Sequence, residues 1–249
     1  MNKISAIIPT FNEEENIEAA IKCVSFADEI IVIDSFSSDN TISIAKKLGA
    51  RVLSRIFDDF SSQKNYAIEK ASHKWIILLD ADERVGKALK AEILKLMINP
   101  ISNAYWVYRR NYLLGREIKY SGWQNDKVIR IIDKDSCRYN GKLVHEEIAL
   151  PNKVGYLKNK LDHFTYKDFD SFIRKKNKVA QLQAKILANS NKKFSFYLLF
   201  AKSSYRFWNH YLFRRGFLDG FQGFFIASFY AYTIFTRYIK LWIINKGLK

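Results

Sequence analysis

The chain has 249 residues, 48% of them hydrophobic, and a formal net charge of +16. This length and composition suit one large domain, or one domain with an appendage, and exclude a chain that is disordered as a whole. The two cysteines, Cys23 and Cys137, are far apart and belong to no CxxC motif or histidine cluster, which argues against a disulfide framework or a structural zinc site and favours a reducing compartment.

The positive charge is unevenly distributed along the chain. Residues 1–150 carry 22 Lys and Arg against 21 Asp and Glu, whereas residues 151–249 carry 19 against four. The two regions are therefore expected to have different partners. The basic region suits a polyanion, either nucleic acid or an anionic lipid surface.

Short apolar strands alternate with helices along the first hundred residues. Strands are predicted at residues 4–8, where Pro9 ends the strand, and at residues 51–54, and buried strands at residues 30–34 and 75–79. One helix is predicted to begin at Glu13, and a second, after the strand at 30–34, to end at Gly49. Two further helices are predicted at residues 61–72 and 88–97. This alternation predicts an α/β fold with a mostly parallel sheet flanked by helices on both sides.

Polar side chains follow three of the predicted strands. Because ligands of open α/β sheets bind at the carboxyl ends of the strands, these side chains are expected to line one crevice. They are Thr10 and Asn12 after the first strand, Asp34 and Asp39 after the second, and Asp80 and Asp82 after the fourth.

The last of these strand ends is strongly acidic. Asp80, Asp82 and Glu83 place three carboxylates within four positions, where they repel one another unless a cation compensates. The alternative is a solvated acidic turn, and the convergence of three strand ends favours a metal site. The first turn has neither a GxGxxG nor a P-loop motif, so a divalent ion is a candidate for neutralising a bound phosphate group.

The three polar segments resemble the signature segments of the family 2 inverting glycosyltransferases, which have the GT-A fold. They are residues 7–14 (IIPTFNEE), 32–41 (VIDSFSSDNT) and 79–83 (LDADE), in the order and spacing of that family. The resemblance implies a nucleotide-sugar donor. Many members have Asp and then Gly where this chain has Ser35 and Phe36, which puts the hydrogen bonds of that turn in doubt.

The resemblance also assigns roles to individual residues. It places Pro9, Thr10, Asn12 and Glu14 beside the base and ribose, Asp34 and Asp39 near the base, and Asp80, Ala81 and Asp82 around the ribose and the pyrophosphate. Asp82 would hold Mg²⁺ or Mn²⁺, which stabilises the leaving diphosphate as a Lewis acid. Lys64 or Arg84 would add positive charge, and the alternative for each is a solvated surface cation.

The middle segment is expected to carry the acceptor chemistry. Asp126, just before a predicted strand at residues 127–131, is the first choice for general base, because inversion needs a carboxylate that takes the proton of the attacking hydroxyl. Here the chain resembles the subgroup that builds bacterial lipopolysaccharide cores by β-1,4-glucosyl transfer, with Gly122-Trp123 and Val144-His145-Glu146. Glu146 is the rival base, and Trp123 and His145 are acceptor candidates.

Three further side chains have two interpretations each. Tyr105 and Trp106, in a predicted strand at residues 104–110, either stack on sugar rings or pack inside the sheet. His163 is either a second metal ligand, since neutral imidazole suits Mn²⁺, or a structural histidine. Its position resembles a His-x-x-Tyr segment of the same subgroup.

The C-terminal region is basic and aromatic. Residues 172–188 form a basic amphipathic helix by pattern, and residues 194–249 contain 19 aromatic residues, eight Lys and Arg, and a single acid, Asp219. The uncharged run 220–236 is barely long enough to span a bilayer, and a helix lying in the membrane interface suits the mixture better. A helical subdomain packed on the catalytic domain is the third interpretation.

The sequence thus predicts a catalytic domain over residues 1–168, with a nucleotide-sugar half (1–100) and an acceptor half (101–168), followed by a membrane-interfacial region over 169–249. By resemblance, the activity is transfer of a hexose, glucose from UDP-glucose, to a heptose of a lipid-linked acceptor. The expected location is the cytoplasmic face of the inner membrane, peripherally, with no signal peptide. The alternatives are a family 2 enzyme with another acceptor and, less well supported, a nucleic-acid-binding protein.

Overall fold

A computed structural model describes residues 1–139, 148–149, 153–166 and 169–248. Two compact units divide the chain, a first unit of Met1–Arg109 with Asp126–His163 and a second unit of Arg110–Asn125 with Phe164–Lys249. Residues 110–125, which the sequence-based division places in the acceptor half, thus group with the C-terminal helices.

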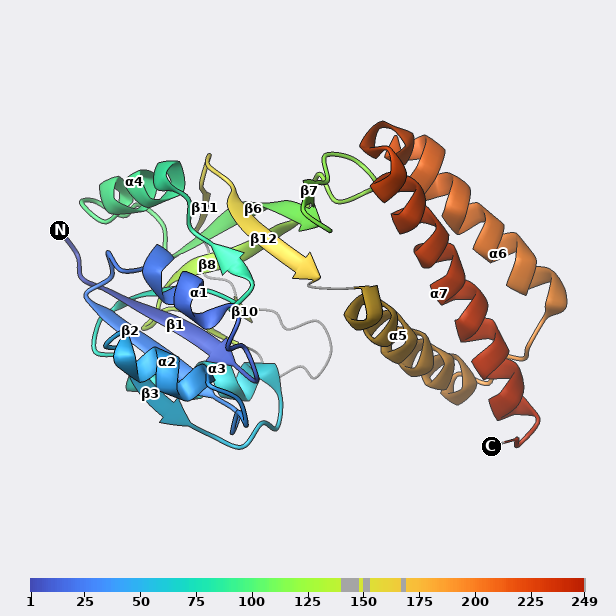
Figure 1. The fold of residues 1–249 in the computed structure, drawn as a ribbon, viewed down its shortest axis with the longest axis horizontal. Coiled ribbons are helices and arrows are strands. Elements are labelled where there is room, and N and C mark those ends of the chain that lie inside the picture. Colours follow the sequence, from blue (N-terminus) through green and yellow to red (C-terminus); the bar gives the residue numbers. More distant parts are fainter. Residues whose placement is uncertain (140–147, 150–152, 167–168, 249) are drawn as a thin grey trace. The chain divides into compact units, whose positions relative to one another are not determined.

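The secondary structure begins with alternating strands and helices and ends in helices (Figure 1). In the first part of the chain the elements are β1 (Ile4–Thr10), α1 (Ile17–Cys23), β2 (Glu29–Asp34), α2 (Thr41–Lys47), β3 (Arg51–Ser54), α3 (Phe60–Lys70), β4 (Trp75–Leu78), β5 (Glu83–Arg84) and α4 (Lys87–Leu96). They continue with β6 (Ala104–Leu113), β7 (Arg116–Glu117), β8 (Lys127–Asp133), β9 (Arg138–Tyr139), β10 (Ile148–Ala149), β11 (Val154–Tyr156) and β12 (Leu161–Tyr166). The last elements are the helices α5 (Phe169–Asn189), α6 (Phe196–Trp208) and α7 (Phe221–Asn245), with a π-helical turn η1 (Asn209–Phe213) and a 3₁₀ turn η2 (Gly216–Asp219) between α6 and α7.

The main sheet is mixed, with strand order β3-β2-β1-β4-β8-β6-β12-β5. Strands β3, β2, β1 and β4 are parallel, as expected, but β8 runs antiparallel to both β4 and β6. The prediction of a mostly parallel sheet is therefore wrong for the second half. The apolar pattern of β8 shows that it is buried but carries no information on its direction.

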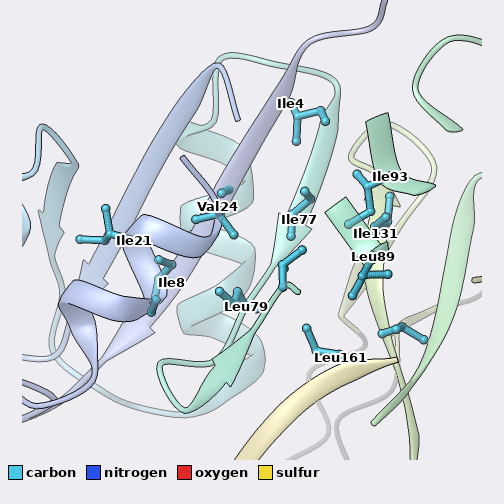
Figure 2. Close-up of a cluster of buried hydrophobic side chains, with 14 of the residues drawn as sticks. Ile4, Ile8, Ile21, Val24, Ile77, Leu79, Leu89, Ile93, Ile131 and Leu161 are labelled. Atoms are coloured by element: carbon cyan, nitrogen blue, oxygen red, sulfur yellow. The ribbon is translucent and has the colours of Figure 1, made fainter. Parts of the chain in front are cut away.

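Helices cover both faces of the parallel half. Side chains of β1 at Ile4, Ala6 and Ile8 pack with α1, α2 and α4, and Ile7 on the opposite face packs with α3. Figure 2 shows the first of these clusters, in which Ile8 and Ile77 come from the neighbouring strands β1 and β4. The β-branched runs favour extended backbone, and both faces are apolar because both are covered.

Pro9 does not end the first strand, contrary to the prediction. Strand β1 continues to Thr10, and Pro9 stays in register with Ile33 of β2. The last β1 residue that pairs with β4 is Ile7. Pro9 thus lies beyond the β4 ladder, where its missing N–H leaves no strand bond unmade.

In the second unit, α7 packs against both α5 and α6. One apolar cluster joins Phe172 of α5 to Phe225 and Ile226 of α7, and another joins Leu199 of α6 to Tyr238 of α7. Within the part of the chain that the structure describes, no helix combines the length and the hydropathy needed to cross a membrane.

Candidate active site

The turn after β2 is built around a buried carboxylate, Asp34. The Thr10 hydroxyl donates to Asp34 Oδ1 (3.2 Å), and the backbone N–H and hydroxyl of Ser37 donate to Oδ2 and Oδ1 (2.8 and 2.5 Å). Asp34 is fully buried. Its side chain therefore fixes the shape of the turn.

Reciprocal hydrogen bonds join the turns after β1 and β2. The Asn12 backbone N–H donates to Ser37 Oγ (2.8 Å), and the Ser38 backbone N–H donates back to Asn12 Oδ1 (2.8 Å). The same exchange links Glu14 with the next turn. Its N–H donates to Asp39 Oδ2 (3.1 Å), while its carboxylate accepts from the backbone N–H of Asn40 (3.0 Å).

Asp39 also starts helix α2. It accepts from the backbone N–H (3.0 Å) and the hydroxyl (2.5 Å) of Thr41, the first helical residue. Burial acts to raise the pKa of Asp39, but the hydrogen bonds from Thr41 and Glu14 outweigh it and lower the pKa. Asp39 is thus ionised at neutral pH, and the two turns form a preorganised unit.

The departure from the family pattern at Ser35 and Phe36 has a structural counterpart. Phe36 has a φ of 61°, in the left-handed region that glycine adopts at least cost. Its side chain is exposed, so packing of the ring does not offset the strain of this backbone conformation. Ser35 Oγ accepts a hydrogen bond from Gln63 Nε2 (3.0 Å), which connects this turn to helix α3.

Helix α3 also reaches the acidic stretch after β4. Its N-cap Asp59 accepts from the Ser62 backbone N–H (2.8 Å), which fixes the start of the helix. Lys64, next to Gln63, extends its Nζ to 3.7 Å from Asp80 Oδ1. Because Lys64 is buried, it is not a solvated surface cation.

Asp80 and Glu83 share one buried arginine. Arg130 of β8 donates from Nε and Nη2 to the two oxygens of Glu83, both at 2.7 Å, and Nη2 also donates to Asp80. Burial acts to raise the pKa of Asp80, but Arg130, Lys64 and Arg109 lower it well below its ordinary range. Glu83 is fully buried, and burial raises its pKa although Arg130 opposes the shift.

A second arginine extends the network to the predicted base. Arg109 of β6 lies with Nη1 3.6 Å from Glu83 Oε1. Its Nε and Nη2 donate to Oδ2 and Oδ1 of Asp126 (2.9 and 2.8 Å). Asp80, Glu83 and Asp126 are thus joined through two arginines, and the bidentate pair with Arg109 fixes the orientation of the Asp126 carboxylate.

Asp82 and His163 face one another, since β12 pairs antiparallel with β5 and sets His163 opposite Glu83. The His163 Nε2 lies 3.5 Å from Asp82 Oδ2. In the described residues, no group of three or more His, Cys, Asp or Glu side chains is arranged to hold a metal ion. One carboxylate with one imidazole nevertheless suits an ion that takes its remaining ligands from water and substrate phosphates.

Arg84, the other residue expected to add positive charge, holds the loop around the acidic stretch through hydrogen bonds to backbone carbonyls. Its Nη1 donates to the carbonyls of Ala81 (2.6 Å) and Glu83 (2.7 Å), and its Nη2 donates to the Asn16 carbonyl (3.2 Å). Ala81 is buried. Arg84 thus fixes the backbone path between Asp80 and Glu83.

Several candidates lie elsewhere. Trp123 belongs to the second unit, where its indole N–H donates to the Tyr230 hydroxyl (3.4 Å) and its ring packs on an apolar cluster. Tyr105 is buried, and its hydroxyl accepts from the backbone N–H groups of Ile101 and Ser102, which favours the packing interpretation. His145 and Glu146 lie outside the described residues.

Sequence reasoning missed Arg109 and Arg130 as members of the site. A signal existed for Arg130, which interrupts an apolar strand, Val128-Ile129-Arg130-Ile131-Ile132. A charge in such a position requires an anionic partner in the interior. The acidic stretch was the obvious candidate for that partner.

In an α/β unit with three polar strand ends at the carboxyl edge of its parallel strands, that edge is the expected ligand site. Residues 5–154 match the model of glycosyl transferase family 2, and the chain belongs to this family. It is therefore a glycosyltransferase, with the GT-A fold of the family.

The relatives agree with this assignment. The chain is 31% identical over 258 residues to an uncharacterized glycosyltransferase of Rickettsia typhi, covering 97% of this chain and 87% of the relative. It is 29% identical over 250 residues to the lipopolysaccharide core biosynthesis glycosyltransferase LpsC of Rhizobium meliloti, covering 94% and 93%.

Among solved structures, glucosyl-3-phosphoglycerate synthase from Mycobacterium tuberculosis, in complex with Mn²⁺, UDP and glucosyl-3-phosphoglycerate, superposes with a TM-score of 0.39 at 24% identity. The match covers 44% of this chain and 44% of that structure. A likeness of this extent adds nothing to the family assignment.

Proposed function

We propose that the protein is a metal-dependent inverting glycosyltransferase that moves a hexose, glucose from UDP-glucose, to a heptose of a lipid-linked lipopolysaccharide core. The observation that carries the proposal is that the turns after β1 and β2 interlock through Asp34 and Asp39, and that helix α3 links them to Asp80 through Gln63 and Lys64. Support for the acceptor class comes from similarity to LpsC over nearly the whole of both chains.

Asp82 and His163 are the side chains that would hold the ion. Lys64, Arg109 and Arg130 already pair with the carboxylates of Asp80, Glu83 and Asp126 and so are engaged before any diphosphate binds. This favours a divalent ion, bound with the donor, as the additional source of positive charge. When bound, the ion stabilises the charge of the leaving diphosphate.

The interlocked turns suit recognition of a nucleoside. Pro9, Thr10, Asn12 and Glu14 line one turn, and Asp34 and Asp39 hold the other in place through hydrogen bonds that need no ligand. Preformed turns cost little ordering on binding. In this proposal Asp80, which Lys64 and Arg130 keep ionised, orients the ribose and the acidic stretch.

Inversion requires one base on the face of the sugar opposite the diphosphate. Asp126 is the proposed base and Glu146 its rival. The pair with Arg109 supports Asp126 because it keeps the carboxylate oriented at the start of β8, the strand that carries Arg130. The acceptor hydroxyl loses its proton to this carboxylate as its oxygen bonds to the anomeric carbon and the bond to the diphosphate breaks.

The proposed location is the cytoplasmic face of the inner membrane, without a spanning segment, since the acceptor is lipid-linked. The basic, aromatic second unit is the part of the chain that suits an anionic lipid surface.

A donor screen tests the proposal. UDP-, GDP- and ADP-sugars are each supplied with and without Mn²⁺, and release of nucleoside diphosphate is measured. The proposal predicts metal-stimulated turnover of UDP-glucose in preference to the other donors. Turnover of a different sugar nucleotide would correct the donor, and no turnover of any donor with a lipopolysaccharide-core acceptor present would contradict the proposal.

Two variants separate the candidate bases. Asp126→Asn and Glu146→Gln are compared at saturating donor, and Asp135→Asn serves as the control because Asp135 is an exposed carboxylate. Loss of the true base lowers kcat by about 10²–10⁴-fold and removes the acidic limb of the pH profile. Equal small losses in both variants would exclude a carboxylate base at either position.

A further inference from the structure

Helix α6 exposes aromatic residues where a surface helix normally exposes charge. Tyr197, Tyr205 and Trp208 are 77%, 64% and 49% exposed, and the opposite side of the helix is buried at Leu199. At 100° per residue, these three side chains fall within about 80° of arc. Ala201 lies within this arc, and Ser204 lies about 20° outside it on the same side of the helix.

The outer face of α6 therefore carries no Lys, Arg, Asp or Glu, the reverse of the usual pattern of an amphipathic surface helix. Contiguous exposed apolar patches of this kind mark interaction surfaces. Tyr and Trp, rather than Leu and Ile, dominate the face. These amphipathic rings are enriched at the boundary between hydrocarbon and headgroups.

A second apolar group lies between α6 and α7, at the turns η1 and η2. Its five members are between 47% and 75% exposed. They are Leu212, Phe213, Phe217, Leu218 and Phe221, and we call this group the apolar tip. The tip joins α6 to α7, which lie side by side in Figure 1.

Cations flank both apolar groups. Lys192 and Lys193 precede α6, and Arg214 and Arg215 lie within the apolar tip, all four of them exposed. The one acid after Asp170 is Asp219, which is buried and accepts hydrogen bonds from the Lys119 and Tyr120 backbone and from Ser121 Oγ. No exposed carboxylate among the described residues of α6, η1, η2 or α7 offsets the positive charge.

We propose that the outer face of α6 and the apolar tip form the surface by which the protein binds an anionic lipid bilayer, with the rings at headgroup depth. This inference deepens the proposed function, on which its biological meaning rests. Charge complementarity identifies the occupant, since exposed cations border an apolar surface that has no acid of its own. Nucleic acid matches the outer face of α6 less well, because its phosphates need cations among the stacking rings and that face carries none.

Vesicle sedimentation tests the surface with the full-length protein. The vesicles are phosphatidylcholine alone or with about one third phosphatidylglycerol, at about 0.1 M salt. The wild-type protein should sediment with the anionic vesicles and much less with the neutral ones. The double variant Trp208→Ala/Phe213→Ala should lower the partition coefficient about tenfold, because each ring loses its transfer into the interface.

The control variant is Ile98→Ala/Ile101→Ala, which removes two side chains of the first unit that are 69% and 74% exposed. It should bind as the wild type does, and thermal unfolding must show both variants folded. Equal binding of Trp208→Ala/Phe213→Ala and wild type would overturn the proposal, as would wild-type protein that stays in the supernatant. A dimer in solution that dissociates in this variant, or salt-sensitive retention of nucleic acid without vesicle binding, would also overturn it.

The outcome is separable from that of the donor screen. Vesicle binding that depends on Trp208 and Phe213, in a protein that turns over no nucleotide sugar, leaves this surface in place and removes the proposed function. Donor hydrolysis in solution should be equal in the double variant and the wild type, since neither residue belongs to the first unit.

Discussion

Arg130 offers the most direct test of the buried charge network. Arg130 is 7% exposed, and its guanidinium donates hydrogen bonds to both oxygens of Glu83, which is fully buried, and to Asp80. Arg130→Met keeps much of the volume and removes the charge. Because one buried carboxylate then loses its main partner, the free energy of unfolding should fall by about 3–5 kcal/mol at about pH 8.

The sign of the pH dependence follows from Glu83. Burial already raises its pKa, and loss of Arg130, which opposes that shift, raises it further. In the unfolded state the pKa of a glutamate is about 4.3. A carboxyl group whose pKa is higher in the folded state takes up its proton there first as the pH falls, and this uptake increasingly stabilises the folded state. The destabilisation by Arg130→Met should therefore shrink between about pH 8 and pH 5.5.

Urea unfolding at the two pH values measures these differences. A double-mutant cycle with Glu83→Gln, which removes the buried charge, should give a coupling energy of about 2 kcal/mol. Arg51→Met is the control, because the Arg51 side chain is half exposed where it pairs with Glu29 and should contribute less than about 1 kcal/mol. Additivity of the two changes within about 0.5 kcal/mol would refute the network as a unit.

Three further predictions concern the turns and the second unit. Phe36→Gly should leave stability unchanged or raise it by up to about 1 kcal/mol, whereas Phe36→Val should lower it, since φ is 61°; equal unfolding midpoints in urea would contradict this. Glu29→Gln should flatten the loss of stability in acid, because burial acts to raise the pKa of Glu29 but hydrogen bonds from Ser5 and Ser72 lower it. The stability that ionised Glu29 contributes is present above about pH 4.3 and is lost as the pH falls through its lowered pKa. Parallel acid titrations of the variant and the wild type, followed by circular dichroism, would contradict this prediction. Asp219→Asn should cost about 2 kcal/mol, because Asp219 accepts from two backbone N–H groups and the Ser121 hydroxyl; thermal unfolding at the wild-type temperature would contradict that role.

The local signals in the sequence were sufficient for the parallel half of the fold. Strand β3 covers residues 51–54 as predicted, and α4 begins and ends within one residue of the predicted 88–97. Isoleucine-rich runs and helical spacing are properties of the segment itself, so they can be read without the rest of the chain. The three strand-end segments followed from the same reasoning.

The remaining features depend on long-range pairing. Nothing in residues 127–133 reports that β8 lies antiparallel between β4 and β6, and the two-residue strands β5 and β7 exist through their partners. The bond between Arg130 and Glu83 joins positions 47 apart in sequence. The sequence pattern shows that Arg130 is buried, but only the fold determines that Glu83 is its partner.

The central claim is that Asp82 serves metal-dependent glycosyl transfer at the carboxyl edge of the sheet. The most direct measurement compares the Mn²⁺-stimulated release of nucleoside diphosphate from the best donor in wild type, Asp82→Asn and the control Asp135→Asn. The account predicts a loss of at least about 10²-fold in Asp82→Asn, near-wild-type turnover in Asp135→Asn, and unchanged stability in both. Wild-type turnover and unchanged metal dependence in folded Asp82→Asn would contradict it.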